Sequence, residues 1–422
     1  MALLTSSFCL FFIIIAYLLD RRLYNPFILF NAWWGISLLL SSMGLFGIYI
    51  PEESTYLIML SVIFFFNFSL IFLSIKRKDH YKQLDFQSDN KLLDKVLLLF
   101  QTFVLIILVI RSIKVLELLI SGLNYSSVRY HYFKLDTIMT GYDFLINDIF
   151  VSPILTFSMI YISLRFFEKK YNKFLILTTF ICLLLQVFSS GGRSIIITFG
   201  IIFMASYLVN KKNFKKLKVS KKLFLSFLIF TVFSSLIFVT LQRLEKESGI
   251  ISVVEMVVRY FSAPYIYFEK MIPFVENDKI YLYGGAFFGG ILDIPIFVVR
   301  ALGFDIAPMS SYISTYNQMY ITVNNHGDIY NAFPTMAYTF YYDFGFLGII
   351  IGSVLFGLFS LISYKKMIQT NNLKYKGIYV LVTITIFESI MRWEGMFMST
   401  WIVILLFILV GFSQKSRLLK LQ

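Results

Sequence analysis

The sequence predicts an all-α polytopic integral membrane protein with about 11 transmembrane helices, arranged as a single integral membrane domain over residues 1–422. Two observations carry this prediction. Hydrophobic residues make up 58% of the chain and charged residues only 15%, which is more apolar surface than a soluble fold can bury. The apolar residues also fall into long runs, and about 20 apolar residues are needed to cross a bilayer as a helix.

Eleven apolar runs are the expected spans. They cover residues 2–19, 27–49, 55–75, 96–112, 148–167, 174–189, 194–209, 223–241, 340–363, 377–391 and 396–413. The first run has no basic residue before it, and Arg21 and Arg22 follow it. We therefore expect an uncleaved span rather than a signal peptide.

The basic residues predict the orientation of these spans. Most of the 38 Lys and Arg residues lie in the segments that follow the odd-numbered runs, and such residues accumulate in cytoplasmic loops. The N-terminus is then outside and the C-terminus in the cytoplasm. The basic run at residues 211–216 lies between two spans, so it indicates topology rather than a nucleic-acid patch.

Two of the predicted outer segments are long. They are a first large periplasmic loop at residues 112–147 and a main periplasmic loop at residues 242–334. Long loops often carry function. Within the main loop, residues 251–261 have helical apolar spacing and residues 286–302 are apolar enough to touch the membrane. We interpret them as short amphipathic or re-entrant helices, because a full span at 286–302 would reverse the later topology.

Arginines next to spans are candidate anion-binding residues. Residues 189–194 read Ser-Ser-Gly-Gly-Arg-Ser and form a short turn between two spans, which holds Arg193 near the bilayer surface. A guanidinium beside a helix start suits a phosphate or pyrophosphate, although it can equally snorkel to lipid phosphates. Arg243, directly after the eighth run, and Arg259 are further candidates.

Glu388 and Arg392 are four residues apart and share a helix face near the end of the tenth span. They are either an ion pair that supports packing or, if they point inward, a second cation for the same anion as Arg193.

The three histidines differ in predicted location: His80 is inside, His131 is in the first outer loop, and His326 is near the end of the main loop. A neutral imidazole can accept a proton from a hydroxyl, and Asp328 could orient His326. A loop histidine can also be a simple surface group. The many tyrosines of the main loop, including Tyr330, suit either sugar stacking or the membrane interface.

Other chemistries lack their sequence signals. Cys9 and Cys182 lie inside apolar runs, so they indicate neither a disulfide framework nor a metal site. The sequence has no zinc-ligand spacing, P-loop or Gly-x-Gly-x-x-Gly motif. We therefore expect no cofactor and no nucleic-acid partner, and the substrate itself or a gradient must supply the energy for any reaction.

A resemblance rests on three of these features together. The Ser-Gly-Gly-Arg-Ser turn at residues 190–194 is followed by the long outer loop. That loop ends in His-Gly-Asp-Ile-Tyr at 326–330 and leads into Tyr-Asp-Phe-Gly-Phe-Leu-Gly at 342–348. The chain resembles the Wzy-type O-antigen or capsule repeat-unit polymerases and is similar to the related O-antigen ligases. The resemblance covers the whole chain as architecture, but its motifs are short. Asn324 and Asn325 before the histidine, and Gly327 after it, depart from the commoner ligase pattern.

The resemblance implies a GT-C-like membrane glycosyltransferase of the bacterial inner membrane that serves lipopolysaccharide or capsule biosynthesis. Such an enzyme transfers a growing glycan from undecaprenyl pyrophosphate to the terminal sugar hydroxyl of a new lipid-linked repeat. His326 would match the candidate base, assisted by Asp328, and Arg193 would lie near the pyrophosphate. Arg243 and Arg392 match that role more loosely, and Arg259, Tyr330 and Glu388 would contact substrate. A chain-length regulator and a flippase are possible partners.

The expected mechanism is metal-independent and inverting, because arginine can replace a metal cation at the pyrophosphate and one direct displacement inverts the anomeric centre. Two other functions stay open at this point. A lipid-linked oligosaccharide flippase or transporter would show internal repeats and polar residues along its spans. An O-antigen ligase would use the same donor and differ in its acceptor.

Overall fold

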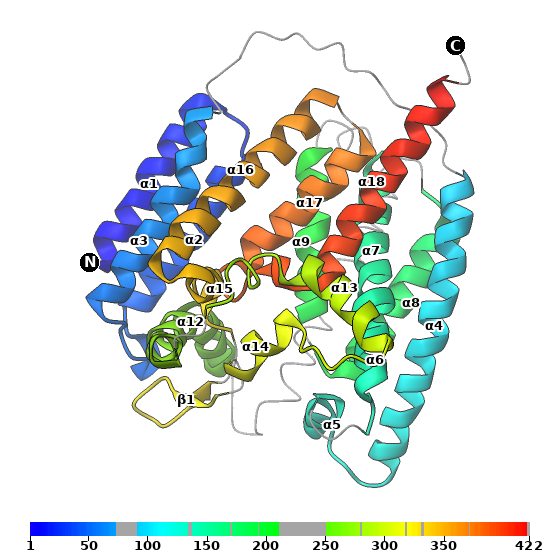
Figure 1. Cartoon of the computed structure of the whole chain (residues 1–422), viewed down its shortest axis with the longest axis horizontal. Coiled ribbons are helices and arrows are strands. Elements are labelled where there is room, and N and C mark those ends of the chain that lie inside the picture. Colours follow the sequence, from blue (N-terminus) through cyan, green and yellow to red (C-terminus); the bar gives the residue numbers. More distant parts are fainter. Residues whose placement is uncertain are drawn as a thin grey trace. The chain divides into compact units, whose positions relative to one another are not determined.

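A computed structural model describes residues 1–72, 91–133, 137–168, 171–192, 194–210, 250–278, 281–316, 319–330, 333–370 and 372–419. These residues are almost entirely helical (Figure 1), and the described chain contains one small sheet, an antiparallel pair of strands. They divide into two compact units. The first comprises Met1–Gln83, Ile250–Thr370 and Val382–Trp401, and the second comprises Leu84–Gly249, Asn371–Leu381 and Ile402–Gln422.

The first unit contains the N-terminal helices and most of the long polar segment. Its elements are α1 (Ala2–Leu19), α2 (Pro26–Ser42), η1 (Leu45–Gly47), α3 (Glu53–Phe68), η2 (Ser69–Phe72), α12 (Ile250–Asp278), α13 (Gly289–Ala301), α14 (Met309–Tyr316), β1 (Ile321–Thr322), β2 (Ile329–Tyr330), α15 (Thr335–Phe344) and α16 (Phe346–Thr370). The C-terminal part of α17 (Leu373–Glu388), η5 (Glu394–Met396) and the first turn of α18 (Met398–Leu419) complete it.

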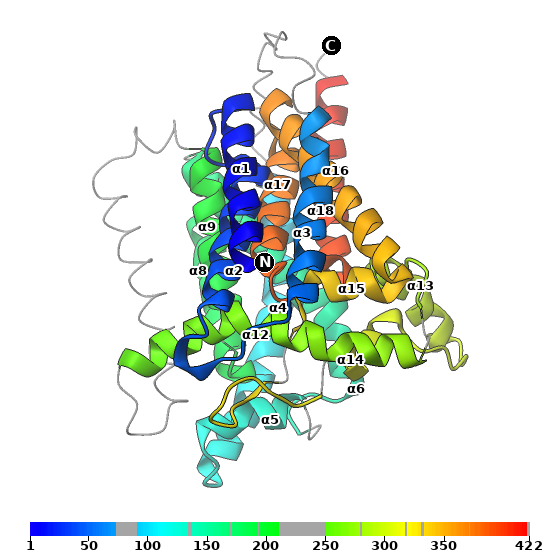
Figure 2. The same cartoon turned by 90° about the vertical axis from the view of Figure 1, so that its left-hand side faces the viewer.

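Helices α1, α2, α3 and α16 run side by side in this unit, and α12 lies across the ends of α2 and α3 (Figure 2). Inside the bundle, Asn31 of α2 and Asn67 of α3 exchange two side-chain hydrogen bonds of 2.8 and 2.9 Å. Because no water reaches a bilayer core, such a pair satisfies both amides and fixes the register of the two helices. Large side chains such as Leu10, Phe64 and Ile362 lie exposed, as helices facing lipid require.

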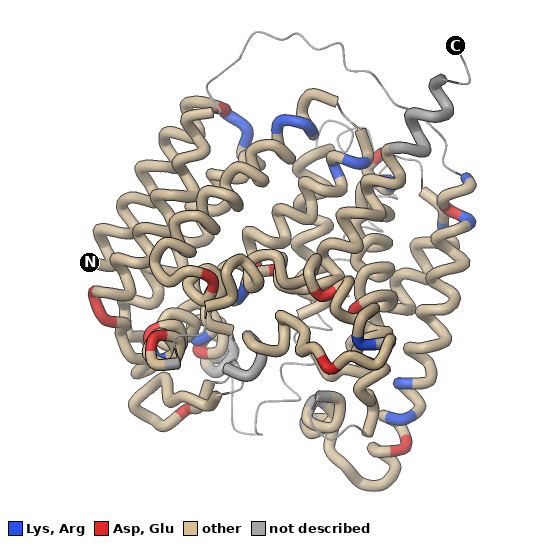
Figure 3. Tube along the Cα trace, in the orientation of Figure 1, with Lys and Arg blue, Asp and Glu red and all other residues tan. Residues whose placement is uncertain are grey.

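The two ends of the first unit differ in charge (Figure 3). At one end, the Tyr364 hydroxyl donates to Asp20 Oδ2 at 2.5 Å, and Lys365 Nζ donates to the carbonyl of Phe72. The ends of α1, η2 and α16, which the charge pattern assigns to one side of the membrane, therefore meet. We call this the basic end. The opposite end carries η1, α12 and the strand pair, and we call it the hairpin end.

The second unit contains α4 (Lys91–Ile120), η3 (Tyr125–Ser127), α5 (Val128–Phe133), α6 (Gly141–Ile146), the π-helical turn η4 (Asn147–Val151), α7 (Ser152–Phe167), α8 (Lys173–Ser190) and α9 (Ser194–Val209), with the N-terminal part of α17 and most of α18. Helix α4 packs along α8, where the Gln101 amide donates to Thr179 Oγ1 and accepts from Thr178 Oγ1. Lys376 Nζ joins Glu168 Oε1 at 2.9 Å and Asn210 Oδ1 at 3.2 Å.

Six described segments are long and apolar enough to cross a membrane. They are Ala2–Leu19, Glu53–Phe72, Lys91–Ile120, Gly141–Phe167, Lys173–Ser190 and Phe346–Thr370. Three shorter apolar helices occupy Pro26–Ser42, Ser194–Val209 and Met398–Gly411. The all-α membrane class is thus supported, whereas the count of 11 spans stays a prediction. The run at 223–241 lies outside the described residues.

Several predicted boundaries differ from the structure. Helix α2 ends at Ser42 rather than near residue 49, because Gly44 and Gly47 adopt left-handed backbone with φ of +57° and +68°. The run at 340–363 breaks at Gly345, which has φ +59° and separates α15 from α16. Helix α4 continues to Ile120, so the first large loop begins as helix. The main loop contains helices at both predicted places, and α12 is far longer than expected.

Close approach of α16 to α3 depends on Gly357. A Cβ built there collides with the carbonyl oxygen of Phe66 and lies 2.7 Å from Ser69 Oγ. We expect Gly357→Ala to destabilise the purified protein by about 1–3 kcal/mol, because an overpacked interface must move apart. Gly200→Ala is the matched control, since nothing lies within 4 Å of its Cβ. Thermal unfolding in detergent measures both, and an equal response of the two variants would contradict this packing.

Candidate functional site

The predicted site residues that the structure describes all belong to the first unit. They are Arg259, His326, Asp328, Tyr330, Glu388 and Arg392. Arg193 and Arg243 lie outside the described residues. The described residues form two groups, one around the strand pair and one at the turn between α17 and α18.

The strand pair forms a tight hairpin that presents His326. Ile321 pairs with Tyr330 and Thr322 with Ile329, and Val323 N donates to the carbonyl of Asp328 at 3.0 Å. The loop between the strands closes with a 3.3 Å hydrogen bond from Gly327 N to Asn324 O. Gly327 has φ +81°, a conformation that favours glycine and explains its place after the histidine.

The side chain of Asn324 holds this loop in shape through three hydrogen bonds. Its side chain is buried, and Oδ1 accepts from the main-chain N–H groups of His326 at 3.2 Å and Asp328 at 2.8 Å. Its Nδ2 donates to Asp328 Oδ2 at 2.8 Å. Asparagine suits this position because one side chain supplies both an acceptor and a donor. The sequence analysis named Asn324 only as a departure from a pattern and missed its role in the loop.

The hairpin is fastened to the connector between α2 and α3, residues 43–52. Asn325 N donates to Gly47 O at 3.0 Å, and Tyr49 N donates to Val323 O at 2.9 Å. Ile48 and Asn324 form an antiparallel bridge. These are main-chain contacts, so they fix where the loop lies while leaving the side chain of His326 exposed.

Asp328 is held by Arg259 rather than by the histidine. Arg259, on α12, forms ion pairs with Asp328 Oδ2 and with Glu255 Oε1, the latter at 2.8 Å. Within the described chain, no hydrogen bond joins the imidazole of His326 to Asp328 or to any other group. In this conformation, Asp328 therefore does not orient the imidazole of His326 through a hydrogen bond. The guanidinium charge, in turn, is shared by two carboxylates.

Tyr330 packs into the core beneath the hairpin, where it is 7% exposed. Its ring lies 5.8 Å from that of Tyr267, whose hydroxyl donates to the Met319 carbonyl at 3.0 Å. Burial raises the pKa of the Tyr330 hydroxyl well above its usual value and that of Tyr267 to about 12, so both stay neutral. Stacking of Tyr330 on a sugar, as predicted from sequence, would require the hairpin to move.

The second group surrounds Arg392. Its Nε lies 2.7 Å from Glu394 Oε1 and 4.0 Å from Glu388 Oε2. The guanidinium also stacks over Phe397 at 4.6 Å and Phe333 at 5.3 Å. The predicted pair of Glu388 and Arg392 is thus present, but Glu394 is the closer partner. Two carboxylates offset the positive charge that an anionic ligand would need.

Buried carboxylates hold the remaining loops of this end in place. Asp343, 2% exposed, accepts from the main-chain N–H groups of Gly284, Ala286 and Phe287 at 2.7 to 2.9 Å. Asp293 of α13 accepts from Met309 N at 2.6 Å at the start of α14. Each carboxyl group thereby joins its own helix to the main chain of another segment. Asp343 lies within the Tyr-Asp-Phe-Gly motif, and this is the only sequence signal that pointed to it.

In the second unit, the turn that leads to Arg193 is well supported. Ser190 Oγ donates to Gln186 O at 2.6 Å and accepts from Gly192 N at 3.1 Å, and Gly191 has φ +56°. The Tyr125 hydroxyl contacts the carbonyl oxygens of Val187 and Phe188 at 3.2 and 3.3 Å. The first large loop therefore caps the end of α8.

Arg111 of α4 is a buried arginine that the sequence analysis missed. Its Nη1 donates to Asn147 Oδ1 at 2.9 Å and its Nη2 to the Asp143 carbonyl at 3.1 Å. Both acceptors are neutral; one lies in α6 and the other begins the π-helical turn, so Arg111 binds α4 to the α6–α7 helix. An arginine near the end of an apolar run was the available signal.

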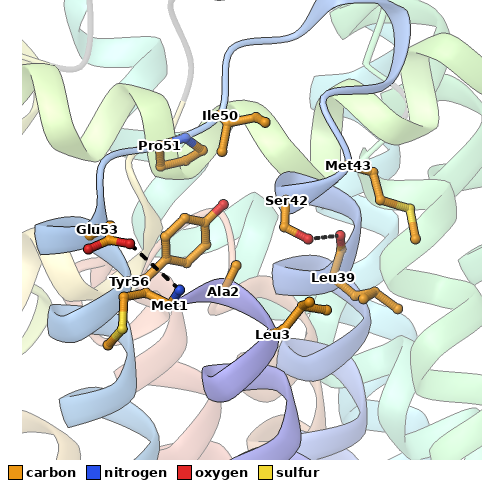
Figure 4. Close-up of a pocket in the computed structure, with 10 residues that line it drawn as sticks. All are labelled: Met1, Ala2, Leu3, Leu39, Ser42, Met43, Ile50, Pro51, Glu53 and Tyr56. Atoms are coloured by element: carbon orange, nitrogen blue, oxygen red, sulfur yellow. Dashed lines mark hydrogen bonds and ion pairs between the residues drawn. The ribbon is translucent and has the colours of Figure 1, made fainter.

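A cavity of about 480 Å³ lies at the ends of α1, α2 and α3 (Figure 4). Apolar side chains such as Leu3, Leu39 and Ile50 line most of it, and Glu53 supplies its only acidic side chain. None of the six described site residues lines this cavity. Within the described ranges, no group of three or more His, Cys, Asp or Glu residues is placed to hold a metal ion.

No protein-family model matches the sequence, and neither a curated protein nor a solved structure shows significant similarity to it.

Loss of the Asn324 side chain tests how the loop is held. Asn324→Ala removes the acceptor of two main-chain N–H groups, each worth about 0.5–1.5 kcal/mol. We therefore expect the amides of His326 and Asp328 to exchange with deuterium about 3- to 10-fold faster. Asn325→Ala is the control, because the Asn325 side chain forms no hydrogen bond within the described chain. Unchanged exchange in Asn324→Ala would show that the loop is held by other contacts.

Proposed function

We propose that the protein polymerises lipid-linked oligosaccharide repeat units on the outer face of the bacterial cytoplasmic membrane. The donor is a growing glycan on undecaprenyl pyrophosphate, and the acceptor is the terminal sugar hydroxyl of a new lipid-linked repeat. In this proposal the chain has 11 spans in a GT-C-like arrangement, with its N-terminus outside and its C-terminus in the cytoplasm. The hairpin end of the first unit then faces the exterior.

The observation that carries the proposal is the presentation of His326. Its imidazole is exposed, forms no hydrogen bond within the described residues, and stands on a hairpin fastened to apolar helices. A general base must have a free lone pair and a fixed position within hydrogen-bond reach of the proton it removes. An exposed base at the end of a membrane bundle fits a substrate whose lipid stays in the bilayer while its glycan projects outward.

The proposed step is one displacement. The acceptor hydroxyl oxygen attacks the anomeric carbon of the donor, and the bond from that carbon to the pyrophosphate oxygen breaks. The hydroxyl proton passes to His326, and undecaprenyl pyrophosphate leaves with the bonding electron pair. Attack from the face opposite the leaving group inverts the anomeric centre. The reaction needs no oxidant or nucleotide, because cleavage of the bond between the donor sugar and its pyrophosphate supplies the driving force.

The charge of the departing pyrophosphate needs cations that are not already neutralised. Arg259 and Arg392 are each shared by two carboxylates, which weakens them for this role. From their sequence positions beside predicted spans, we assign the pyrophosphate first to Arg193 and Arg243, which lie outside the described residues, with Arg392 as an auxiliary. The carboxylates around Arg259 and Arg392 suit sugar hydroxyls instead, since an ionised carboxylate only accepts hydrogen bonds.

Purified protein incubated with lipid-linked repeat units and a metal chelator should produce a ladder of longer glycans. His326→Gln should lower the rate about 10²- to 10⁴-fold, the usual contribution of a general base. His131→Gln is the control, because His131 lies in the second unit near Thr137. A ligase would not elongate the repeats without its own acceptor, and a flippase would form no new bond. A His326→Gln variant with full activity would remove the base assignment.

Arg193→Ala should leave membrane insertion intact and reduce surface glycans to single repeats, because the leaving group loses its cation. Arg300→Ala provides a matched loss of charge at an exposed residue with no assigned role. Gel sizing of surface glycans, with immunoblots of membrane fractions, measures both variants. Wild-type chain lengths in Arg193→Ala would remove that residue from the mechanism.

A further inference from the structure

The connector between α2 and α3 meets the histidine loop at Gly47. Three main-chain contacts join the two segments: Asn325 N to Gly47 O, Tyr49 N to Val323 O, and the bridge between Ile48 and Asn324. The connector is short and belongs to the N-terminal helices. No sequence pattern placed it in a functional site, because its residues read as the end of an apolar run.

Gly47 lies directly against the imidazole. A Cβ built on Gly47 would be 3.3 Å from Nε2 and 3.5 Å from Cδ2 of His326. Any side chain at this position therefore presses on the edge of the ring that carries Nε2. Gly47 also has φ +68°, which side chains other than glycine rarely adopt.

The other described interactions of the loop do not involve the imidazole ring. Asn324 accepts hydrogen bonds from the main chain of the loop, and Arg259 forms an ion pair with Asp328. The space above Gly47, which a Cβ at that position would enter, borders the ring next to Nε2.

We propose that Gly47 is a positioning residue for His326, and that the α2–α3 connector sets the location of the proposed base relative to the membrane bundle. The inference rests on the proposed function, in which His326 removes the acceptor proton. It extends that function to the N-terminal helices: they position the chemistry of a loop nearly 280 residues further along the chain. Because proton transfer requires close contact, a base displaced by about 1 Å can lose a large factor in rate.

The test compares Gly47→Ala with Gly44→Ala in the full-length purified protein. Gly44 lies in the same connector with φ +57°, so an alanine there meets similar backbone strain. Its Cβ contacts Ile50 and the Ile48 carbonyl at 3.4–3.5 Å and does not touch His326. We expect Gly47→Ala to lower kcat about 10-fold with KM for the lipid-linked repeat nearly unchanged. Gly44→Ala should keep kcat within about twofold of wild type at an equal loss of thermal stability.

A second measurement detects the contact without the reaction. The chain has three histidines, so selective isotope labelling gives three imidazole signals in an NMR spectrum, and His326→Gln identifies the relevant one. We expect Gly47→Ala to shift the His326 signal and Gly44→Ala to leave it in place. If Gly47→Ala folds poorly, the shift of the signal in the folded fraction still reports the contact.

The outcomes separate the two proposals. A shifted His326 signal with unchanged kcat in Gly47→Ala would overturn the positioning role. An unshifted signal would overturn the contact itself. If the signal shifts while His326→Gln keeps full activity, the contact stands and the proposed function loses its base.

Discussion

A buried amide side chain in these helices needs partners within the chain, because a bilayer core supplies no water. Two groups of hydrogen-bonded side chains meet this need. Asn31 and Asn67 exchange two hydrogen bonds in the first unit, and Gln101 joins Thr178 and Thr179 in the second. Each pair is satisfied at one register only, so it fixes how far one helix is shifted along its neighbour. The ends of the helices, and whatever is attached to them, take their positions from these registers. Irregular backbone is then confined to the helix ends, where the hairpin and the α17–α18 turn lie.

Charge pairing at the hairpin end of the first unit follows a different rule. Arg259 and Arg392 each meet two carboxylates, and the buried carboxylates of Asp293 and Asp343 are satisfied by main-chain N–H groups. Nearby carboxylates therefore offset the positive charge of both arginines, and main-chain donors satisfy both buried carboxylates. Under the proposed function, the pyrophosphate of the substrate would then need cations other than Arg259 and Arg392.

The sequence predicted the positions of the long apolar helices, but it did not predict the contacts between segments far apart in the chain. Apolar runs located the long apolar helices of the described chain, because length and composition decide whether a helix can cross a bilayer, but they did not locate α5, α6 or α14. They failed at residues 43–49 and near residue 345, where apolar side chains continue past a left-handed glycine that ends the helix. The pair of Glu388 and Arg392 was visible from its spacing. The pairing of Arg259 with Asp328, and the N–H groups around Asp343, join residues about 60 to 70 positions apart, and no local pattern reports such partners.

The contacts that locate His326 explain why sequence patterns could not identify its supports. Most of them are main-chain hydrogen bonds, which any residue except proline can form. They therefore leave no signature in side-chain chemistry. Gly47 is the exception, because its residue type matters. Its backbone has a positive φ, and a Cβ at this position would press on the imidazole. A loop within a long polar segment has many conformations to lose, and attachment to a short connector between two packed helices removes most of them at once. The position of His326 is therefore tied to the packed helices, although its own segment begins and ends far from that connector in the chain.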